Sequence, residues 1–415
     1  MKKIRKIFLP VFAQILLCSA YAQNAPCIIF SGPRWIASHG SAQQVPEPQN
    51  ALPADAEHDI TLREIFHLSA GGSEFRVRFS NAFGITPLKI AGAHVAPAVS
   101  TASAEIVAGK DRALTFAGAT EVTIPTGAEY ISDAVDLPVA DLSNLAVSLH
   151  LMQLPGVQTG HPGSRATSYY VHGDAVSAAN FNDPAKINHW YFVSGVDVLT
   201  NGGATLVALG DSITDGHGST TNGNDRWPDL LSARLNTGDS TCAYGVVNAG
   251  IGGNHLLVDG LGPNAMARLD RDVLTRAGVH WAIVLEGVND LGGLTIQAKA
   301  TPAEHEEMVH HLEGAFQQII LRAHAAGLRI YGATILPYMG SNYYHPDAMN
   351  EEDRRALNTW IRAHYDAVVD FDAVMRDSQH PERLLPAYDS GDHLHPSLAG
   401  YKAMAAAIPK DLFTR

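Results

Sequence analysis

Two short segments of the sequence hold residue types that can work together in nucleophilic catalysis. The first is Gly210-Asp211-Ser212, where a serine follows an apolar run, and the second pairs Asp392 with His395 near the C-terminus. A spacing of three puts both side chains on the same side of one helix-like turn, so the carboxylate can orient the imidazole. Gly-Asp-Ser alone is also common in turns and at helix N-caps. The serine segment by itself therefore leaves catalysis open.

Two further segments could stabilise negative charge. Residues 248–254 are rich in glycine, which lets the backbone come close to an anion and aim N–H groups at it. Residues 286–290 offer the side-chain amide of Asn289 beside a glycine. A dinucleotide loop is the alternative for the first segment, but His255 stands where that pattern needs its third glycine. We therefore expect no nucleotide cofactor.

Alternating strand and helix patterns surround these segments and predict a parallel sheet with helices on both faces. Working residues of such sheets lie just beyond the carboxyl ends of the strands. The expected strands are Thr205–Leu209, Gly245–Asn248, His280–Leu285, Arg329–Leu336 and Ala367–Phe371. The expected helices are Trp227–Leu235, a long helix ending at Gly327, Asn358–Tyr365 and Ser397–Ile408.

The N-terminal half has a different pattern, in which apolar residues alternate every second position from about residue 28 to 199. Two examples are residues 75–80 and 145–151, and both predict strands with one buried face. Frequent turn signals and little helical period indicate an all-β sandwich. With a linker at 201–203, the expected domains are an accessory β-sandwich at 23–200 and an α/β/α domain at 204–415.

The four segments, in this order, resemble the SGNH hydrolases, also called GDSL esterases and lipases. Ser212 matches the Gly-Asp-Ser block, Gly253 the family glycine and Asn289 the Gly-x-Asn-Asp block, while Asp392 and His395 match the Asp-x-x-His-Pro block. The resemblance covers residues 204–415 and implies a three-layer fold of flavodoxin-like type. The N-terminal half looks like the accessory β-domain of secreted bacterial GDSL esterases grouped with xylan-degrading systems.

The resemblance implies a serine esterase without a cofactor. Ser212 would be the nucleophile, His395 the general base and Asp392 the group that orients the imidazole. The N–H groups of Ser212 and Gly253 and the amide of Asn289 would form the oxyanion hole. The sequence departs from the family pattern at Ile213, where the name has leucine, and at Gly252, where many members have serine.

Histidines and tyrosines elsewhere raise two further possibilities. His305 and His310 are five apart, on different helix faces, and do not make the usual His-Glu-x-x-His zinc pattern, so we expect no metal. Three tyrosines follow the strand at 329–336, where their rings could stack on sugars or simply pack: Tyr338, Tyr343 and Tyr344.

The N-terminus predicts export. Residues 1–22 combine a basic start, an apolar run of about 12 residues and an Ala-x-Ala cleavage site, whereas a spanning helix needs ~20. We expect cleavage after Ala22, a secreted or periplasmic protein, and no remaining transmembrane anchor. Cys27 and Cys242 could then form a disulfide or stay as thiols.

These observations together predict the function. A net charge of −13 argues against nucleic acid as a partner. We expect a secreted serine esterase that hydrolyses short-chain esters, acetyl esters above all, on acetylated polysaccharide or oligosaccharide. The alternatives are a lipase or lysophospholipase of the same family and, from another class, a catalytically dead carbohydrate-binding protein.

Overall fold

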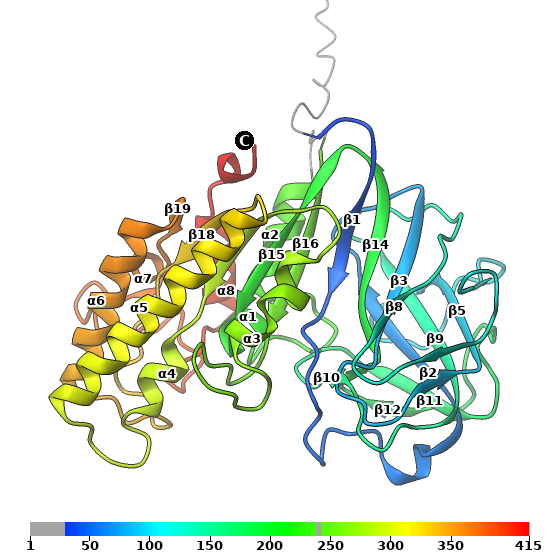
Figure 1. Cartoon of the computed structure of the whole chain (residues 1–415), viewed down its shortest axis with the longest axis horizontal. Coiled ribbons are helices and arrows are strands. Elements are labelled where there is room, and N and C mark those ends of the chain that lie inside the picture. The colour runs from blue at the N-terminus through cyan, green and yellow to red at the C-terminus, as the bar shows by residue number, and fades with distance from the viewer. Residues whose placement is uncertain (1–29, 238–241, 415) are drawn as a thin grey trace, which may run out of the picture.

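The computed structural model describes residues 30–237 and 242–414, and Figure 1 shows two parts that lie side by side. The expected signal peptide, residues 1–22, lies outside the described residues, as does Cys27. Cys242 is disulfide-bonded, and its pairing with Cys27 stays a prediction. None of the helices in the described ranges has the length and apolar character needed to span a membrane.

The N-terminal part is built from antiparallel strands. They are β1 (Pro33–Gly40), β2 (His58–His67), β3 (Glu74–Ser80), β4 (Leu88–Ile90), β5 (Gly92–Pro97), β6 (Arg112–Ala113), β7 (Val122–Ile124), β8 (Glu129–Ile131), β9 (Asn144–Gln153), β10 (Gly160–His161), β11 (Ser168–His172), β12 (Ala185–Ile187), β13 (Trp190–Tyr191) and β14 (Val193–Asn201). One sheet has the order β1-β14-β3-β8 and the other β12-β11-β2-β9-β5-β6. Side chains of both sheets, such as Val77 and Leu149, share one apolar core, which confirms the predicted all-β part.

The expectation of one buried face per strand is wrong for β9. Ala146 and Ser148 point away from the main core, yet they are only 1% and 2% exposed. A second apolar cluster covers that face, formed in part by Ala104, Ile106 and Phe181 from loops outside the sheets. Loops that fold back over a sheet bury residues that the alternation assigns to solvent.

The C-terminal part holds a parallel sheet in the order β16-β15-β17-β18-β19. Its strands are β15 (Gly203–Gly210), β16 (Ala243–Gly250), β17 (Val279–Leu285), β18 (Arg329–Ala333) and β19 (Ala367–Val369). Its helices are α1 (Ser212–Asp215), α2 (Trp227–Asn236), α3 (Ala265–Leu269), α4 (Val288–Gly293), α5 (Pro302–Ala325), α6 (Ala348–His364), α7 (Phe371–Met375) and α8 (Leu398–Ala407). Helix α2 packs against α8, and α5 against α6, as right-handed crossovers on two faces require. The predicted α/β fold class is confirmed.

Two elements differ from the sequence expectation. Strand β18 ends at Ala333 rather than at Leu336, because the next residues leave the sheet toward the candidate site. Helix α6 begins at Ala348, ten residues earlier than expected, after an N-cap in which Asp347 accepts the N–H groups of Met349 and Asn350. The polar residues of its first turns hide the helical period.

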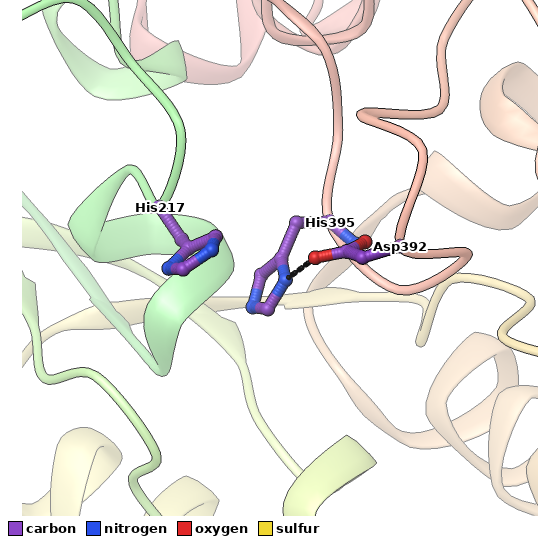
Figure 2. Close-up of side chains that lie close together, drawn as sticks. All are labelled: His217, Asp392 and His395. Carbon is purple, nitrogen blue, oxygen red and sulfur yellow. Dashed lines mark hydrogen bonds and ion pairs between the residues drawn. The ribbon is translucent and has the colours of Figure 1, made fainter. Parts of the chain in front are cut away.

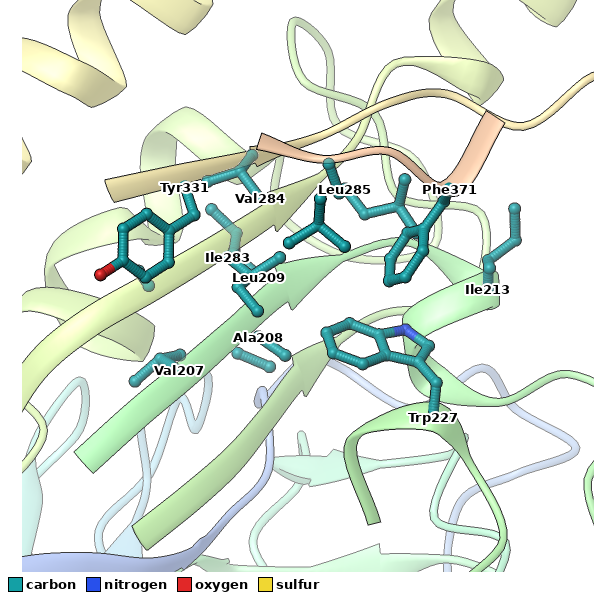
Figure 3. Close-up of a cluster of buried hydrophobic side chains, with 14 of the residues drawn as sticks. Val207, Ala208, Leu209, Ile213, Trp227, Ile283, Val284, Leu285, Tyr331 and Phe371 are labelled. Carbon is teal, nitrogen blue, oxygen red and sulfur yellow. The ribbon is translucent and has the colours of Figure 1, made fainter. Parts of the chain in front are cut away.

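Apolar side chains of the strands and helices pack together and stabilise the parallel sheet (Figure 3). Val207 and Leu209 of β15 and Ile283 of β17 are fully buried. Trp227 at the start of α2 meets Phe371 edge to face, with ring centroids 5.6 Å apart. This packing fixes the strand ends that carry the candidate site.

The two parts are in direct contact along β1. The backbone N–H of Ala37 donates to Thr205 Oγ1 at 2.9 Å. Gly245 of β16 is required here, since a Cβ would overlap the carbonyl oxygen of Ala37. β14 ends at Asn201 and β15 begins at Gly203, while the division into separate domains stays a prediction.

Candidate active site

The candidate residues gather at the carboxyl edge of the parallel sheet. Ser212 follows β15, Gly253 follows β16 and Asn289 follows β17. β15 lies between β16 and β17, so the chain leaves it in one direction and returns on its other side. A crevice forms at such a switch point, and Ser212 stands at it.

The nucleophile segment is held by local hydrogen bonds. Asp211 caps α1 by accepting the N–H of Ile213 at 2.8 Å, and burial raises the pKa of Asp211 to about 7. Residue 210 must be glycine, because a Cβ at this position would overlap Oγ1 of Thr214. Ser212 is 8% exposed, and its Oγ lies 2.8 Å from Nε2 of His395.

Asp392 holds the imidazole of His395 from the other side. His395 Nδ1 lies 2.6 Å from Asp392 Oδ2, and the backbone N–H of His395 donates to Oδ1 at 2.8 Å. Burial by itself would raise the pKa of Asp392, but these bonds and the Leu394 N–H hold it well below its usual value. An ionised Asp392 fixes the proton on Nδ1 and leaves Nε2 free to accept one from Ser212.

A second Asp–His pair lies in the same loop. His393 Nδ1 is 2.6 Å from Asp389 Oδ2, and the His393 side chain is 51% exposed. Its backbone is left-handed, with φ +61°. Of the two histidines, only His395 contacts Ser212.

Three hydrogen-bond donors surround the space in front of Ser212. Within the described residues, the backbone N–H groups of Ser212 and Gly253 donate to no other group. Asn289 gives one amide hydrogen to the carbonyl of Asn254 at 2.6 Å and keeps the second. Ser212, Gly253 and Asn289 all line one cavity of about 910 Å³. Such donors suit a developing oxyanion.

The three tyrosines have different places. Tyr344 lines the cavity but is 4% exposed, and its hydroxyl donates to Asn289 Oδ1 at 2.5 Å. Tyr338 is 1% exposed and does not line the cavity, so of the two possibilities for this candidate the structure supports packing and not contact with a substrate. Tyr343 is 63% exposed and lines the cavity.

Two supporting residues hold the strand ends together: Arg268, which no motif indicated, and Asp290, the last residue of the Gly-x-Asn-Asp block. Arg268 is fully buried and donates to the carbonyls of Ala249 at 2.6 Å and Gly210 at 3.0 Å. Asp290 accepts the N–H groups of Leu256 and Leu257 at 2.8 and 3.1 Å. These bonds tie the loops after β15, β16 and β17 into one frame.

The β-rich part also reaches the site. His161 Nε2 lies 3.0 Å from Asp215 Oδ1, and Asp215 Oδ2 accepts the N–H of Gly252 at 3.1 Å. Seven residues of the β-rich part line the cavity: Gln44, Glu47, Asn50, Pro162, Gly163, Arg165 and His189. One wall of the cavity therefore comes from the β-rich part. No sequence motif indicated this contribution.

His217 stacks on the candidate base (Figure 2). Its ring centroid is 4.0 Å from that of His395, and burial lowers its pKa, with His395 and Arg165 lowering it further. Donor atoms of His217, Asp392 and His395 lie within 4.8 Å of one another. A metal ion bound to His395 would have to displace Ser212 or Asp392, since both ring nitrogens already have partners.

Comparison with known proteins identifies a family for the C-terminal part of the chain. Residues 208–403 match the model of the GDSL-like Lipase/Acylhydrolase family, and this range includes Ser212, Gly253, Asn289, Asp392 and His395. No curated protein was found to match the chain.

Several solved structures resemble about half of the chain. A GDSL-like lipase from Bacteroides thetaiotaomicron is 20% identical, with 49% of this chain and 84% of that chain covered and a TM-score of 0.36. A variant of an acetyl xylan esterase from Geobacillus stearothermophilus is 23% identical, with coverage of 50% and 93% and a TM-score of 0.36. The family match alone places the segment 208–403 in the GDSL-like lipase/acylhydrolase family, and the chain is a carboxylic ester hydrolase.

Proposed function

We propose that the chain is an exported serine esterase that removes short acyl groups, acetyl above all, from carbohydrate esters. The observation that carries this proposal is the continuous contact from Ser212 Oγ through His395 to Asp392, at 2.8 and 2.6 Å. This chain of contacts lies in the cavity lined by the three unpaired donors.

The proposed reaction has two halves. Ser212 Oγ attacks the ester carbonyl carbon while His395 Nε2 takes the hydroxyl proton. The negative oxygen accepts hydrogen bonds from the N–H groups of Ser212 and Gly253 and from the Asn289 amide, each worth about 3–4 kcal/mol in comparable sites. Collapse breaks the bond to the alcohol, which leaves with the proton from Nε2.

The second half repeats these steps with water. A water molecule gives a proton to His395 Nε2 and attacks the acyl group on Ser212. The second tetrahedral intermediate expels Ser212 Oγ, which regains its proton, and the carboxylic acid leaves. Asp392 stays ionised throughout and stabilises the imidazolium each time it forms.

Polar groups in the cavity support a carbohydrate alcohol. Gln44, Asn50 and Asn342 line it together with the exposed ring of Tyr343, which supplies amides for sugar hydroxyls and a flat surface for a sugar face. The export signal expected at residues 1–22 fits a substrate outside the cytoplasm.

The lipase alternative has one observation in its favour. Val258 and Leu261, in the loop after β16, are 56% and 53% exposed, and Leu261 lines the cavity. Exposed apolar side chains at a site can hold an acyl chain. Long acyl substrates therefore belong in the test.

Initial rates on nitrophenyl esters of rising acyl length, alongside acetylated xylan and pectin, test the proposal. We expect kcat/KM to be highest for acetyl esters and to decline as the acyl chain lengthens. We also expect acetate release from at least one of the two polymers. A maximum at long chains would favour the lipase. A wild type that hydrolyses none of these esters faster than the uncatalysed reaction would favour the catalytically dead binding protein.

A further inference from the structure

The charged side chains that line the cavity differ in whether they have a hydrogen-bond partner. Its three carboxylates already accept hydrogen bonds from neighbouring side chains: Glu47 from Asn50, Asp215 from His161, and Asp392 from His395. Arg165 lines the same cavity. Its guanidinium makes no ion pair, hydrogen bond or cation–π contact with any residue of 30–237 or 242–414. Its Nε is buried without an acceptor.

The backbone at Arg165 is held in one place. Its φ is +51°, a left-handed conformation that is unfavourable for a residue with a side chain. The loop is tied to the hydrolase part by Asn222, whose N–H donates to the carbonyl of Arg165 at 2.8 Å and whose Oδ1 accepts the N–H of Thr167 at 2.8 Å. A cation that has no partner among the described residues and stands on a fixed backbone is suited to bind an anionic group of a ligand.

The position of Arg165 relates it to the alcohol half of the ester. Together with burial and His395, the positive charge of Arg165 lowers the pKa of His217, and it opposes the rise in the pKa of buried Tyr401. The ring of His217 stacks on His395, and the hydroxyl of Tyr401 donates to the His217 carbonyl at 2.8 Å. Arg165, His217 and His395 all line the cavity, and His395 is the base that returns its proton to the departing alcohol in the proposed reaction.

We propose that Arg165 binds a carboxylate carried by the alcohol half of the substrate, so that the enzyme prefers acyl esters of acidic alcohols such as sugar acids. A guanidinium offers paired N–H donors that match the two oxygens of a carboxylate, and Nε would gain its missing acceptor. This inference rests on the proposed esterase function and adds the class of alcohol.

The test compares two acetyl esters that differ in one charge. para-Acetoxybenzoate carries a carboxylate on its alcohol half, and para-acetoxybenzamide is its neutral counterpart of nearly the same shape. The ratio of their kcat/KM values should fall about 10- to 100-fold in Arg165→Gln, the range for a lost hydrogen bond to a charged group. Arg165→Lys should recover part of the ratio, because it keeps the charge without the paired donors. Arg112→Gln, at an exposed arginine of the β-rich part, should leave it as in the wild type.

Two further measurements keep the outcomes separate. Monophenyl succinate carries its carboxylate on the acyl half, so a loss in Arg165→Gln confined to this ester would overturn the placement on the alcohol side. para-Hydroxybenzoate should bind at least about tenfold more weakly to Arg165→Gln than to the wild type in a titration followed by NMR. A ratio and an affinity both within twofold of the wild type would overturn the proposal. If neither acetyl ester is cleaved by the wild type, the esterase function fails, while the titration still decides the role of Arg165.

Discussion

His161 Nε2 lies 3.0 Å from Asp215 Oδ1, and both side chains are buried. The pair joins the β-rich part to the helix that carries Ser212, and Asp215 in turn accepts the N–H of Gly252 beside the candidate oxyanion donor Gly253. Removal of the imidazole would leave Asp215 buried without this partner, which costs about 1–3 kcal/mol for such a group.

His161→Leu should therefore lower kcat about 10- to 100-fold with a smaller change in KM, because Asp215 and the Gly252-Gly253 loop lose their anchor. Steady-state kinetics on nitrophenyl acetate measure both constants. His161→Gln should recover part of kcat, since it keeps an N–H donor, and His58→Leu, at an exposed histidine of β2, should match the wild type. Wild-type kcat in a folded His161→Leu variant would contradict a positioning role.

Tyr344 should support catalysis through Asn289. Tyr344→Phe removes the donor to Asn289 Oδ1, so the buried amide can rotate and its free N–H no longer points at the oxyanion. We therefore expect kcat to fall by about one to two powers of ten. Tyr343→Phe is the matched control, because the Tyr343 hydroxyl donates no side-chain hydrogen bond in the described ranges. Equal kcat values for the two variants would argue against this role.

His395 should be the base rather than His393. His395→Ala removes the group that contacts Ser212 and should abolish ester hydrolysis, whereas His393→Ala should keep a substantial part of it. If His393→Ala is the inactive variant, Asp389 becomes the orienting acid in place of Asp392.

The pH profile provides a second measure of the same pair. The pKa of Asp392 is lowered in the folded chain, so its contacts stabilise the fold above the usual carboxyl pKa of ~3.9 and are lost as pH falls through the lower, folded value. Asp392 thus stays ionised in mild acid. Protonation of Asp392 should therefore not contribute to a fall of kcat/KM in mild acid, and Asp392→Asn should be impaired at every pH. An Asp392→Asn variant as active as the wild type near neutral pH would contradict this assignment.

Activity should not depend on a metal ion. His217, Asp392 and His395 cluster within 4.8 Å, but the contacts of His395 with Ser212 and Asp392 would compete with metal binding. Prolonged dialysis against EDTA should leave hydrolysis of nitrophenyl acetate intact. Loss on chelation followed by recovery with zinc would reverse the assignment.

The sequence was informative where the determinants are local. Apolar runs predicted the five parallel strands, and the three-residue spacing of Asp392 and His395 predicted a carboxylate beside an imidazole, which the structure places at 2.6 Å. It was less informative where distant segments meet. Arg165 reaches the cavity and His161 reaches Asp215 only because the β-rich part packs against the parallel sheet, and no spacing in the sequence indicates these contacts.

Burial was the other quantity that local pattern could not supply. Tyr338 and Tyr344 belong to the same short segment as Tyr343, yet the first two are buried and the third is exposed. Tyr344 is buried against Asn289 of α4, which lies 55 positions earlier in the chain. In the same way, the outer face of β9 is covered by loops whose course alternation does not predict.

The rate of ester hydrolysis by Ser212→Ala is the most direct measure of whether Ser212 is the nucleophile. We expect a variant that folds like the wild type and hydrolyses nitrophenyl acetate at least about a thousandfold more slowly, because loss of one triad member leaves only the oxyanion donors and substrate binding. A rate within tenfold of the wild type would contradict nucleophilic catalysis by Ser212.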